Sequence, residues 1–170
     1  MRLAVSALAA LLSACATVPP PGESATATLR TAGGVEVGTV TASAMDGGVH
    51  VVLAARAMPV GVHGVHLHAV GRCDGPDFAS AGPHWNTATS KHGTMSDSGQ
   101  GPGHAGDLPN LTIAANGSGS LDAHAPSGTF ANMMDADGAA VVVHAAPDDL
   151  MTDPSGNSGA RIACGVFARN

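Results

Sequence analysis

The sequence predicts an all-β domain in which about eight short antiparallel strands form a sandwich or a flattened Greek-key barrel. Three observations predict this fold class. The chain contains 23 Gly and 11 Pro, so turns must be frequent. Only 2% of its residues are aromatic, so the core must come mostly from Val, Leu, Ile and Ala, and β-branched residues favour strands. No segment shows a convincing helical period.

The first residues indicate export. Arg2 precedes an apolar run over residues 3–12, which is too short to span a bilayer as a stable helix. The small residues before Cys15 resemble a bacterial lipoprotein cleavage box. We therefore expect a signal peptide over 1–14, a lipid on Cys15 and a membrane-anchored protein in the periplasm. The alternative is ordinary signal cleavage nearby, with Cys15 discarded.

A tether is expected to join Cys15 to the folded domain. Residues 15–24 contain three consecutive prolines followed by Gly22, a pattern typical of an extended linker. A disordered N-terminal tail would give the same structural expectation. The folded domain is predicted to cover residues 25–170.

Strand and turn patterns follow in order. Strands are predicted over 25–31, 35–44, 49–57, 60–69, 110–115, 120–125, 139–145 and 160–168. Gly33-Gly34 and Asp46-Gly47-Gly48 indicate tight hairpins, and residues 116–119 (Asn-Gly-Ser-Gly) indicate another turn. Residues 71–110 show no regular pattern. A loop of that length counts against a compact domain unless it is functional, and this one is rich in His.

Charge and cysteine content exclude some functions. The chain has 7 basic and 13 acidic residues, a formal charge of −6. It has no cluster of Lys and Arg, so nucleic-acid binding is not expected. After export, Cys73 and Cys164 remain as an even pair in an oxidising compartment, where a disulfide is the default expectation.

The central motif is Gly64-Val65-His66-Leu67-His68. In a strand, residues i and i+2 lie on one face, about 6.6–7 Å apart. His66 and His68 can therefore point the same way while Val65 and Leu67 point into a core. Two neutral imidazoles at this spacing can bind one copper or zinc ion. Two exposed strand histidines are the simpler alternative.

The other candidate ligands favour a metal site. His144 lies near a strand end, and the long loop carries His84, His92, His104 and Asp107. Seven donors exceed one tetrahedral site and fit two metals if one ligand is shared. An imidazole has two nitrogens, so His84 is the natural shared residue. An all-imidazole set suits copper, and a set with one carboxylate suits zinc. No free Cys remains for a zinc finger or an iron–sulfur site.

Six segments together resemble the copper,zinc superoxide dismutase family, in the family's order and over nearly all of the chain after the tether. They are Gly64–His68, Ala81–Asn86, Lys91–Gly93, His104–Asn110, Val142–His144 and Gly159–Val166. The resemblance implies an eight-stranded Greek-key fold with long metal-binding loops. The longer segment between Cys73 and His84 is similar to that of the bacterial members.

Carried over residue by residue, the resemblance implies copper on His66, His68, His84 and His144, and zinc on His84, His92, His104 and Asp107. Arg161 would lie beside the copper, where a fixed cation holds a small anion. Cys73 and Cys164 would form the family's disulfide. Asp148 would link a copper His to a zinc His, although one gap in the alignment would put Asp149 there instead.

The implied activity is the dismutation of superoxide to oxygen and hydrogen peroxide, with His84 delivering a proton. One alternative is a non-catalytic periplasmic protein that binds or buffers copper. A buffer has no use for Arg161, which favours the enzyme. A zinc hydrolase fits poorly because no candidate Glu base is present.

The remaining residues carry weaker expectations. No Lys or Arg occurs between His144 and Arg161, so Lys91 or Arg72 is a candidate for the steering cation of many relatives. His50, His63 and His124 are expected to be structural or exposed, and Trp85 to pack within the loop. The sequence allows a homodimer without predicting one.

Overall fold

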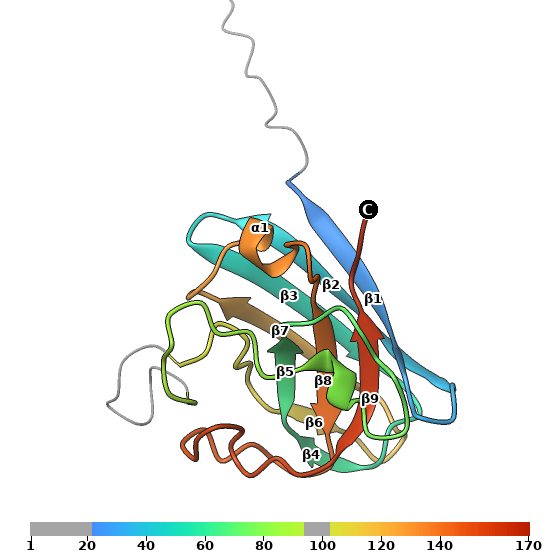
Figure 1. Ribbon diagram of the computed structural model, residues 1–170. Helices are drawn as coiled ribbons and strands as arrows, with labels where there is room; N and C mark the ends of the chain where they lie inside the picture. Colours follow the sequence, from blue (N-terminus) through green and yellow to red (C-terminus); the bar gives the residue numbers. More distant parts are fainter. Residues whose placement is uncertain (1–21, 94–102) are drawn as a thin grey trace, which may run out of the picture.

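The computed structural model describes residues 22–93 and 103–170, in which antiparallel strands form a curled sheet (Figure 1). The strands are β1 (Ser24–Arg30), β2 (Glu36–Met45), β3 (Gly48–Ala55), β4 (Gly61–His63), β5 (Val65–His68), β6 (Leu111–Ile113), β7 (Gly119–Ala125), β8 (Ala140–His144), β9 (Arg161–Val166) and β10 (Ala168–Arg169). Two short helical turns, η1 (Ala79–Ala81) and α1 (Phe130–Met133), complete the described part. The all-β fold class is confirmed.

The sheet closes on itself through short strands. The main sheet has the order β5-β8-β9-β1-β2-β3-β7, with β10 also paired to β1, and β4 pairs with β6 separately. β6 packs against β7, where a Cβ on Gly119 would lie only 2.4 Å from the carbonyl oxygen of Thr112. Because β4 continues directly into β5, this contact joins the two ends of the sheet. The arrangement is consistent with the expected Greek-key barrel.

Two predicted strands are each divided in the structure. The stretch 60–69 forms β4 and β5, which are separated at Gly64 and pair with different partners, β6 and β8. A Cβ at Gly64 would lie 2.9 Å from Cβ of Ser158, so a glycine lets the loop after β8 come close at the division. Similarly, 160–168 is divided at Phe167, whose N–H donates to Ala139 O. The sequence patterns did not reveal these changes of partner.

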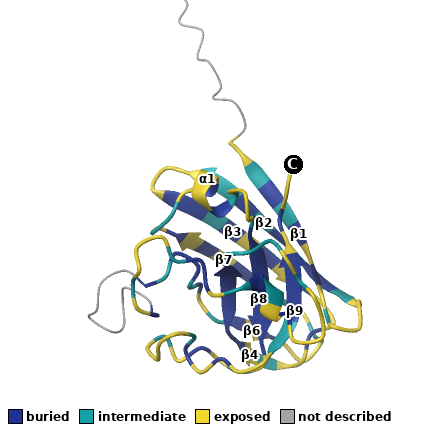
Figure 2. Cartoon of the chain, viewed as in Figure 1, coloured by how far each residue is buried: buried dark blue, intermediate teal, exposed yellow. Residues whose placement is uncertain are grey.

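The core lies inside the curled sheet, and the loops cover β5 and β8 from the outside (Figure 2). Val65 and Leu67 belong to the main core, as predicted for the residues between the two histidines. Every residue of β5 and β8 is buried. On their outer side, Phe78 and Ala81 pack with Ala140 and Val142 in a second, smaller apolar cluster. The outer face of β5 is therefore enclosed between sheet and loop.

The predicted N-terminal features lie outside the described residues. These are the signal peptide over 1–14, lipidated Cys15 and most of the tether over 15–24. β1 begins at Ser24, one residue before the predicted domain start. In the described part of the chain, no helix is long and apolar enough to span a membrane.

Candidate metal centre

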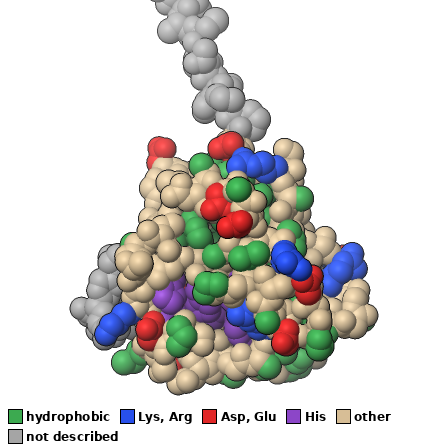
Figure 3. Space-filling view, viewed as in Figure 1, with side chains coloured by type: hydrophobic (Ala, Val, Ile, Leu, Met, Phe, Trp, Pro, Cys, Tyr) green, Lys and Arg blue, Asp and Glu red, His purple; other side chains and the backbone are tan. Residues whose placement is uncertain are grey.

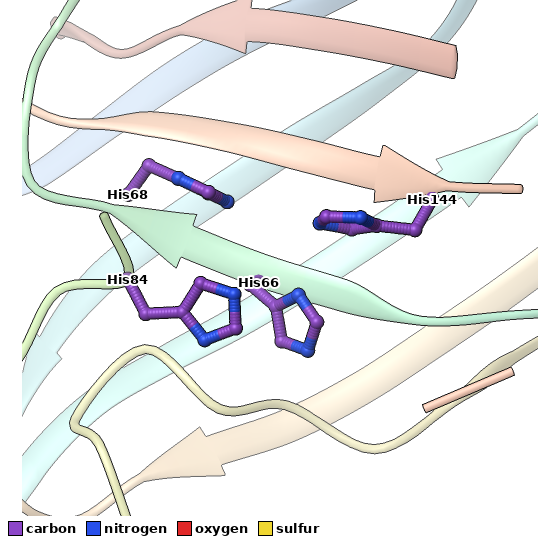
Figure 4. Close-up of side chains that lie close together, drawn as sticks. All are labelled: His66, His68, His84 and His144. Carbon is purple, nitrogen blue, oxygen red and sulfur yellow. The ribbon is translucent and has the colours of Figure 1, made fainter. Parts of the chain in front are cut away.

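Four histidines gather on the outer side of β5. His66 and His68 project from β5, His144 ends β8, and His84 follows the turn after η1 (Figure 4). All four are buried, and one ring nitrogen of each lies within 4.8 Å of the others. Pairing in the sheet sets His66 opposite Val142, while an isolated bridge sets His68 opposite His84. Strand alternation and sheet pairing thus bring together the four residues that the resemblance implied for copper.

Each ring of this group turns an unpaired nitrogen toward the others. Within the described residues, Nδ1 of His66 and Nε2 of His68, His84 and His144 are buried without a hydrogen-bond partner. The opposite nitrogens are occupied. His68 Nδ1 donates to Gly82 O at 2.8 Å, and His144 Nδ1 donates to Gly159 O at 3.2 Å. Since a carbonyl oxygen only accepts, these bonds fix the proton on Nδ1 and leave the lone pair on Nε2 for a metal.

A second group forms around Asp107. Three nitrogens surround Asp107 Oδ1, namely His84 Nδ1 at 2.9 Å, His92 Nδ1 at 3.0 Å and His104 Nδ1 at 3.3 Å. His104 Nδ1 is 3.4 Å from His84 Nδ1. A tetrahedral zinc site with ligand distances of 2.0–2.1 Å has ligand atoms about 3.3–3.4 Å apart. The spacings of Asp107 from the three histidines and of His84 from His104, 2.9–3.4 Å, are close to those in one zinc site.

His66 also has a ring nitrogen within 4.8 Å of donors from His84, His92 and Asp107. His104 is nevertheless the better fourth donor of the second group. His66 Nε2 is bonded to Asp148 Oδ2 at 2.6 Å, and its Nδ1 is unpaired like the inward nitrogens of the first group. In contrast, the N–H of His104 donates to Asp107 Oδ2, which holds His104 beside that carboxylate.

His84 is shared by the two groups. Its Nε2 belongs to the unpaired set of the first group, and its Nδ1 faces Asp107 in the second. The His84 ring stacks on the ring of His66 with centroids 3.9 Å apart. A single imidazole is therefore positioned to contact both metal positions.

A buried carboxylate links the groups from the other side. Asp148 Oδ2 lies 2.6 Å from His66 Nε2, and Asp148 Oδ1 lies 2.9 Å from His92 Nε2. The neighbouring Asp149 instead accepts hydrogen bonds within its own loop, from Thr152 and Asn157. The structure thus places Asp148, not Asp149, between a histidine of each group.

Burial keeps three histidines of the first group, His68, His84 and His144, neutral. It lowers the pKa of His68 to about 2, and mutual repulsion with His84 and with His144 adds to this effect. Burial likewise lowers the pKa of His144 to about 3 and the pKa of His84 to about 4. Neutral imidazole is the form that binds a metal, so these rings are ready to bind at neutral pH.

Carboxylates reverse the effect of burial at His92. Burial alone would lower the pKa of His92, but hydrogen bonds to Asp107 and Asp148 raise it to about 9. Burial would raise the pKa of both carboxyls, yet bonds from the surrounding histidines hold each pKa below its ordinary value. His92 and the two carboxylates therefore form an ionic network.

A cavity of about 760 Å³ opens onto both groups. His84, His104, His144 and Arg161 line it. Figure 3 shows histidine side chains lying together in a hollow of this face, with a Lys or Arg beside them. Arg161 is held by two carbonyls, since Nη1 donates to Phe78 O at 2.7 Å and Nη2 to Gly82 O at 2.8 Å. A fixed guanidinium beside the first group can hold a small anion there.

The disulfide between Cys73 and Cys164 is confirmed, with Cα atoms 5.7 Å apart. It ties the loop that supplies Phe78 and Gly82 to β9, which begins with Arg161. The cross-link thus joins the two segments that hold the guanidinium.

The candidate steering cations differ in their surroundings. Arg72 forms an ion pair with Asp74 and is not among the residues lining the cavity. Lys91 is exposed and directly follows Ser90, which does line it. Lys91 therefore stays the better candidate of the two.

The histidines expected to be structural or exposed lie outside both groups. His63 is buried, with Nδ1 2.8 Å from His144 O and Nε2 2.9 Å from Pro59 O. His50 pairs with Asp122 on the sheet surface, and His124 is exposed. Trp85 is buried against Gly128, where a Cβ would lie 2.2 Å from its ring.

Sequence reasoning missed several residues that support the site. Asn110 Nδ2 donates to Asp148 O, and the N–H of Asp148 donates to Asn110 Oδ1, both at 2.8 Å. Gly82 accepts from both His68 and Arg161. Gly156 allows the backbone to pass against Asp148. Asn110 ends the family-like segment His104–Asn110, which could have drawn attention to it. Its hydrogen-bond partner, Asp148, is distant in the sequence.

Comparison with known proteins agrees with this geometry. A family profile described as copper/zinc superoxide dismutase (SODC) matches residues 36–167. A superoxide dismutase [Cu-Zn] of Caulobacter vibrioides is 40% identical over 151 residues, covering 85% of this chain and 85% of that protein.

Solved structures are also similar to the chain. A Cu/Zn superoxide dismutase from Brucella abortus has a TM-score of 0.69 and 30% identity, covering 86% of this chain and all of that one. A structure of a SOD-like protein from Bacillus subtilis has a TM-score of 0.76 and 35% identity, covering 84% and 97%.

Proposed function

The chain belongs to the copper/zinc superoxide dismutase family, and we propose that it acts through a copper ion and a zinc ion that share His84. Family membership makes it an enzyme that dismutes superoxide with copper and zinc. The proposed copper ligands are His66, His68, His84 and His144. The proposed zinc ligands are His84, His92, His104 and Asp107.

One observation carries this assignment. The inward nitrogens of His66, His68, His84 and His144 lack a hydrogen-bond partner within the described residues, and they face one point. A buried polar atom without a partner costs about 1–3 kcal/mol, so a cluster of them is costly unless a ligand fills it. The outer nitrogens are held by carbonyls and carboxylates, which fixes the rings for binding.

Copper, when bound, would supply the one-electron oxidation and reduction of superoxide, while zinc is redox-silent. Overall, two superoxide anions and two protons give dioxygen and hydrogen peroxide. Arg161 binds the anion, because its guanidinium is fixed in the cavity wall that also contains His84 and His144. The sheet and the loop clusters bury the rings, so the reacting anion approaches from this cavity, whose wall contains His84, His144 and Arg161.

His84 also serves as the proton carrier in this proposal. Its Nε2 has no partner within the described residues and faces the copper ligands, so it can take up a proton and donate it to the reduced anion. Its Nδ1 stays beside Asp107, so the ring keeps its orientation when Nε2 changes partner. Asp148 bonds to His66 and His92 and thereby fixes the two ligand sets relative to each other.

We also propose that the enzyme is exported and anchored to a membrane in the periplasm through a lipid on Cys15. The support is the basic start, the apolar run and the small residues before Cys15 in the sequence. A disulfide in the folded domain suits an oxidising compartment. Globomycin treatment of expressing cells, which blocks lipoprotein signal cleavage, should leave an unprocessed precursor.

Metal buffering without turnover is not favoured. A buffer needs ligands alone, whereas this chain fixes Arg161 with two hydrogen bonds in the cavity wall beside the ligands. Superoxide is an anion, so this arrangement suits a substrate site.

The test is to load the purified protein with copper and zinc and to measure superoxide removal by wild type and His144→Ala. We expect activity to fall at least about 100-fold in His144→Ala, because the copper site loses one of its four donors and the copper is no longer held beside Arg161. The control is His124→Ala, an exposed histidine of β7 that should leave activity unchanged. Wild-type protein that binds copper but removes no superoxide would contradict the proposal and support metal buffering.

A further inference from the structure

We propose that Asp153 is a positioning residue of the zinc site, where its carboxylate holds the backbone of His92 and faces the ring of His104. Its hydrogen bond would fasten His92 to the loop 145–160, which follows β8, and its negative charge would act on the ring of His104. This inference rests on the zinc ligands proposed above.

The contacts of Asp153 reach two ligands at once. Asp153 Oδ1 accepts a hydrogen bond from the backbone N–H of His92 at 2.8 Å. The same oxygen lies 3.9 Å from His104 Nε2. One carboxylate thus faces two of the proposed zinc ligands, which are distant from it in the sequence.

Each zinc-ligating histidine needs a partner for the ring nitrogen that faces away from the zinc. Asp153 supplies this partner for His104, and the other histidines have different partners. His92 has its outer nitrogen bonded to Asp148 Oδ1. His84 turns its Nε2 toward the copper ligands. His104 has its Nδ1 among the zinc donors, and for its Nε2 the carboxylate within 4 Å among the described residues is that of Asp153. A negative charge at this nitrogen favours the tautomer with the proton on Nε2 and the lone pair on Nδ1.

The loop 145–160 is internally bonded and can therefore hold Asp153 in place. Asp149 accepts hydrogen bonds from the backbone of Met151 and Thr152 and from the side chains of Thr152 and Asn157. The N–H of Gly156 donates to Thr152 O at 2.6 Å. These bonds bracket Asp153 on both sides. The carboxylate is thus presented by a preformed turn, and less entropy is lost when it contacts the zinc ligands.

Asp153 also has a second effect that the experiment must separate. Its side chain is 54% exposed and lines the cavity that contains Arg161. A negative charge there opposes the approach of superoxide, so removing it changes the reaction rate even if Asp153 positions nothing. Asp77 is the matched control for charge. Its negative charge acts to raise the pKa of Arg161, which burial lowers, and it lines a hollow that adjoins the cavity.

The experiment compares Asp153→Ala, Asp153→Asn and Asp77→Asn with wild type, all loaded with copper and zinc. Zinc affinity is measured by competition with a chromophoric chelator, and the zinc site is also examined by the visible absorption of the cobalt-substituted protein. Loss of an outer partner typically weakens metal binding 10–100-fold. We expect a loss of that size in Asp153→Ala and a smaller one in Asp153→Asn, which keeps an oxygen for the His92 N–H. Asp77→Asn should keep wild-type zinc affinity.

Wild-type zinc affinity and an unchanged cobalt spectrum in both Asp153 variants would overturn the inference. An equal loss of affinity in Asp77→Asn would also overturn it, because the effect would then come from charge in the cavity. If Asp153→Ala fails to fold, the comparison of Asp153→Asn with Asp77→Asn decides. His92→Ala tests the premise separately, since unchanged zinc affinity in that variant would refute the proposed zinc ligands themselves.

Discussion

Gly156 lies directly against the carboxylate that links the two metal groups. It has φ +61°, and a Cβ at this position would lie 1.7 Å from Asp148 Oδ1 and 2.7 Å from His92 Nε2. Any side chain would therefore displace the Asp148 carboxylate in addition to straining the backbone. This glycine is required by a contact as well as by its backbone angle, whereas Gly34 is required by the backbone angle alone.

Gly156→Ala should therefore destabilise the protein and weaken its zinc site. An alanine in the left-handed region costs about 1–2 kcal/mol by itself, and the overlap with Asp148 should raise the loss to about 3 kcal/mol or more. Denaturant unfolding and zinc competition measure the two effects. Gly34→Ala is the control, since Gly34 has φ +79° and nothing lies within 4 Å of an added Cβ. Equal losses in the two variants would contradict the argument.

At the scale of elements, the metal centre is an assembly of loops on two strands. β5 and β8 supply His66, His68 and His144, but the remaining ligands come from the segment between β5 and β6. Asn110 stands just before β6 and forms two hydrogen bonds with the backbone of Asp148. One amide side chain thus fastens the loop 145–160 to the ligand segment.

Asn110→Ala should loosen this attachment. It leaves the N–H and the carbonyl of Asp148 without their partner, at a cost of about 1–3 kcal/mol. Thermal unfolding of the metal-free protein should show this loss, and zinc affinity should fall because Asp148 no longer holds His92. Asn116→Ala provides the comparison, since among the described residues the Asn116 side chain bonds within its own turn, to Ser118. A wild-type zinc affinity in Asn110→Ala would show that Asp148 needs no such support.

At the scale of the whole molecule, the buried histidines couple folding to pH. Burial lowers the pKa of His68, His144 and His84 to about 2, 3 and 4, so these rings stay neutral in the folded, metal-free protein well below pH 6.5. In the unfolded chain they take up protons below about pH 6.5, which stabilises the unfolded state. His92 acts oppositely, because its pKa is raised to about 9. The stabilisation of the folded protein by His92 is fully present below pH 6.5 and is lost as the pH rises through 9.

The free energy of unfolding of the metal-free protein should therefore be highest near pH 6.5–7 and should fall in both directions. On the acid side, each buried histidine that stays neutral contributes a slope of about 1.4 kcal/mol per pH unit. Urea unfolding at several pH values measures the profile. His68→Gln should reduce the acid slope, and His124→Gln, which removes an exposed ring, should leave it unchanged. A flat profile between pH 7 and 5 would refute the assignment of neutral buried rings.

The fold class was predictable because its signals are local. Alternating apolar residues and glycine-rich turns gave β1, β2, β3 and β7 close to their observed bounds. The division of residues 60–69 was not predictable. Gly64 breaks that strand because the loop with Ser158 comes close, and this contact depends on residues distant in the sequence.

The sequence by itself determined which chemical groups are present and how neighbours are arranged. Strand alternation placed His66 and His68 on one side with Val65 and Leu67 in the core, and the order of motifs indicated the family. Only the tertiary structure decided which nitrogen of each ring faces inward, because the partners that occupy the outer nitrogens, such as Gly82 and Asp148, come from other segments. It likewise decided between Asp148 and Asp149, and it revealed Asn110, Asp153 and Gly156. Short-range periodicity fixes a side of a strand, but ring orientation and loop attachment depend on contacts between distant residues, which exist only in the folded chain.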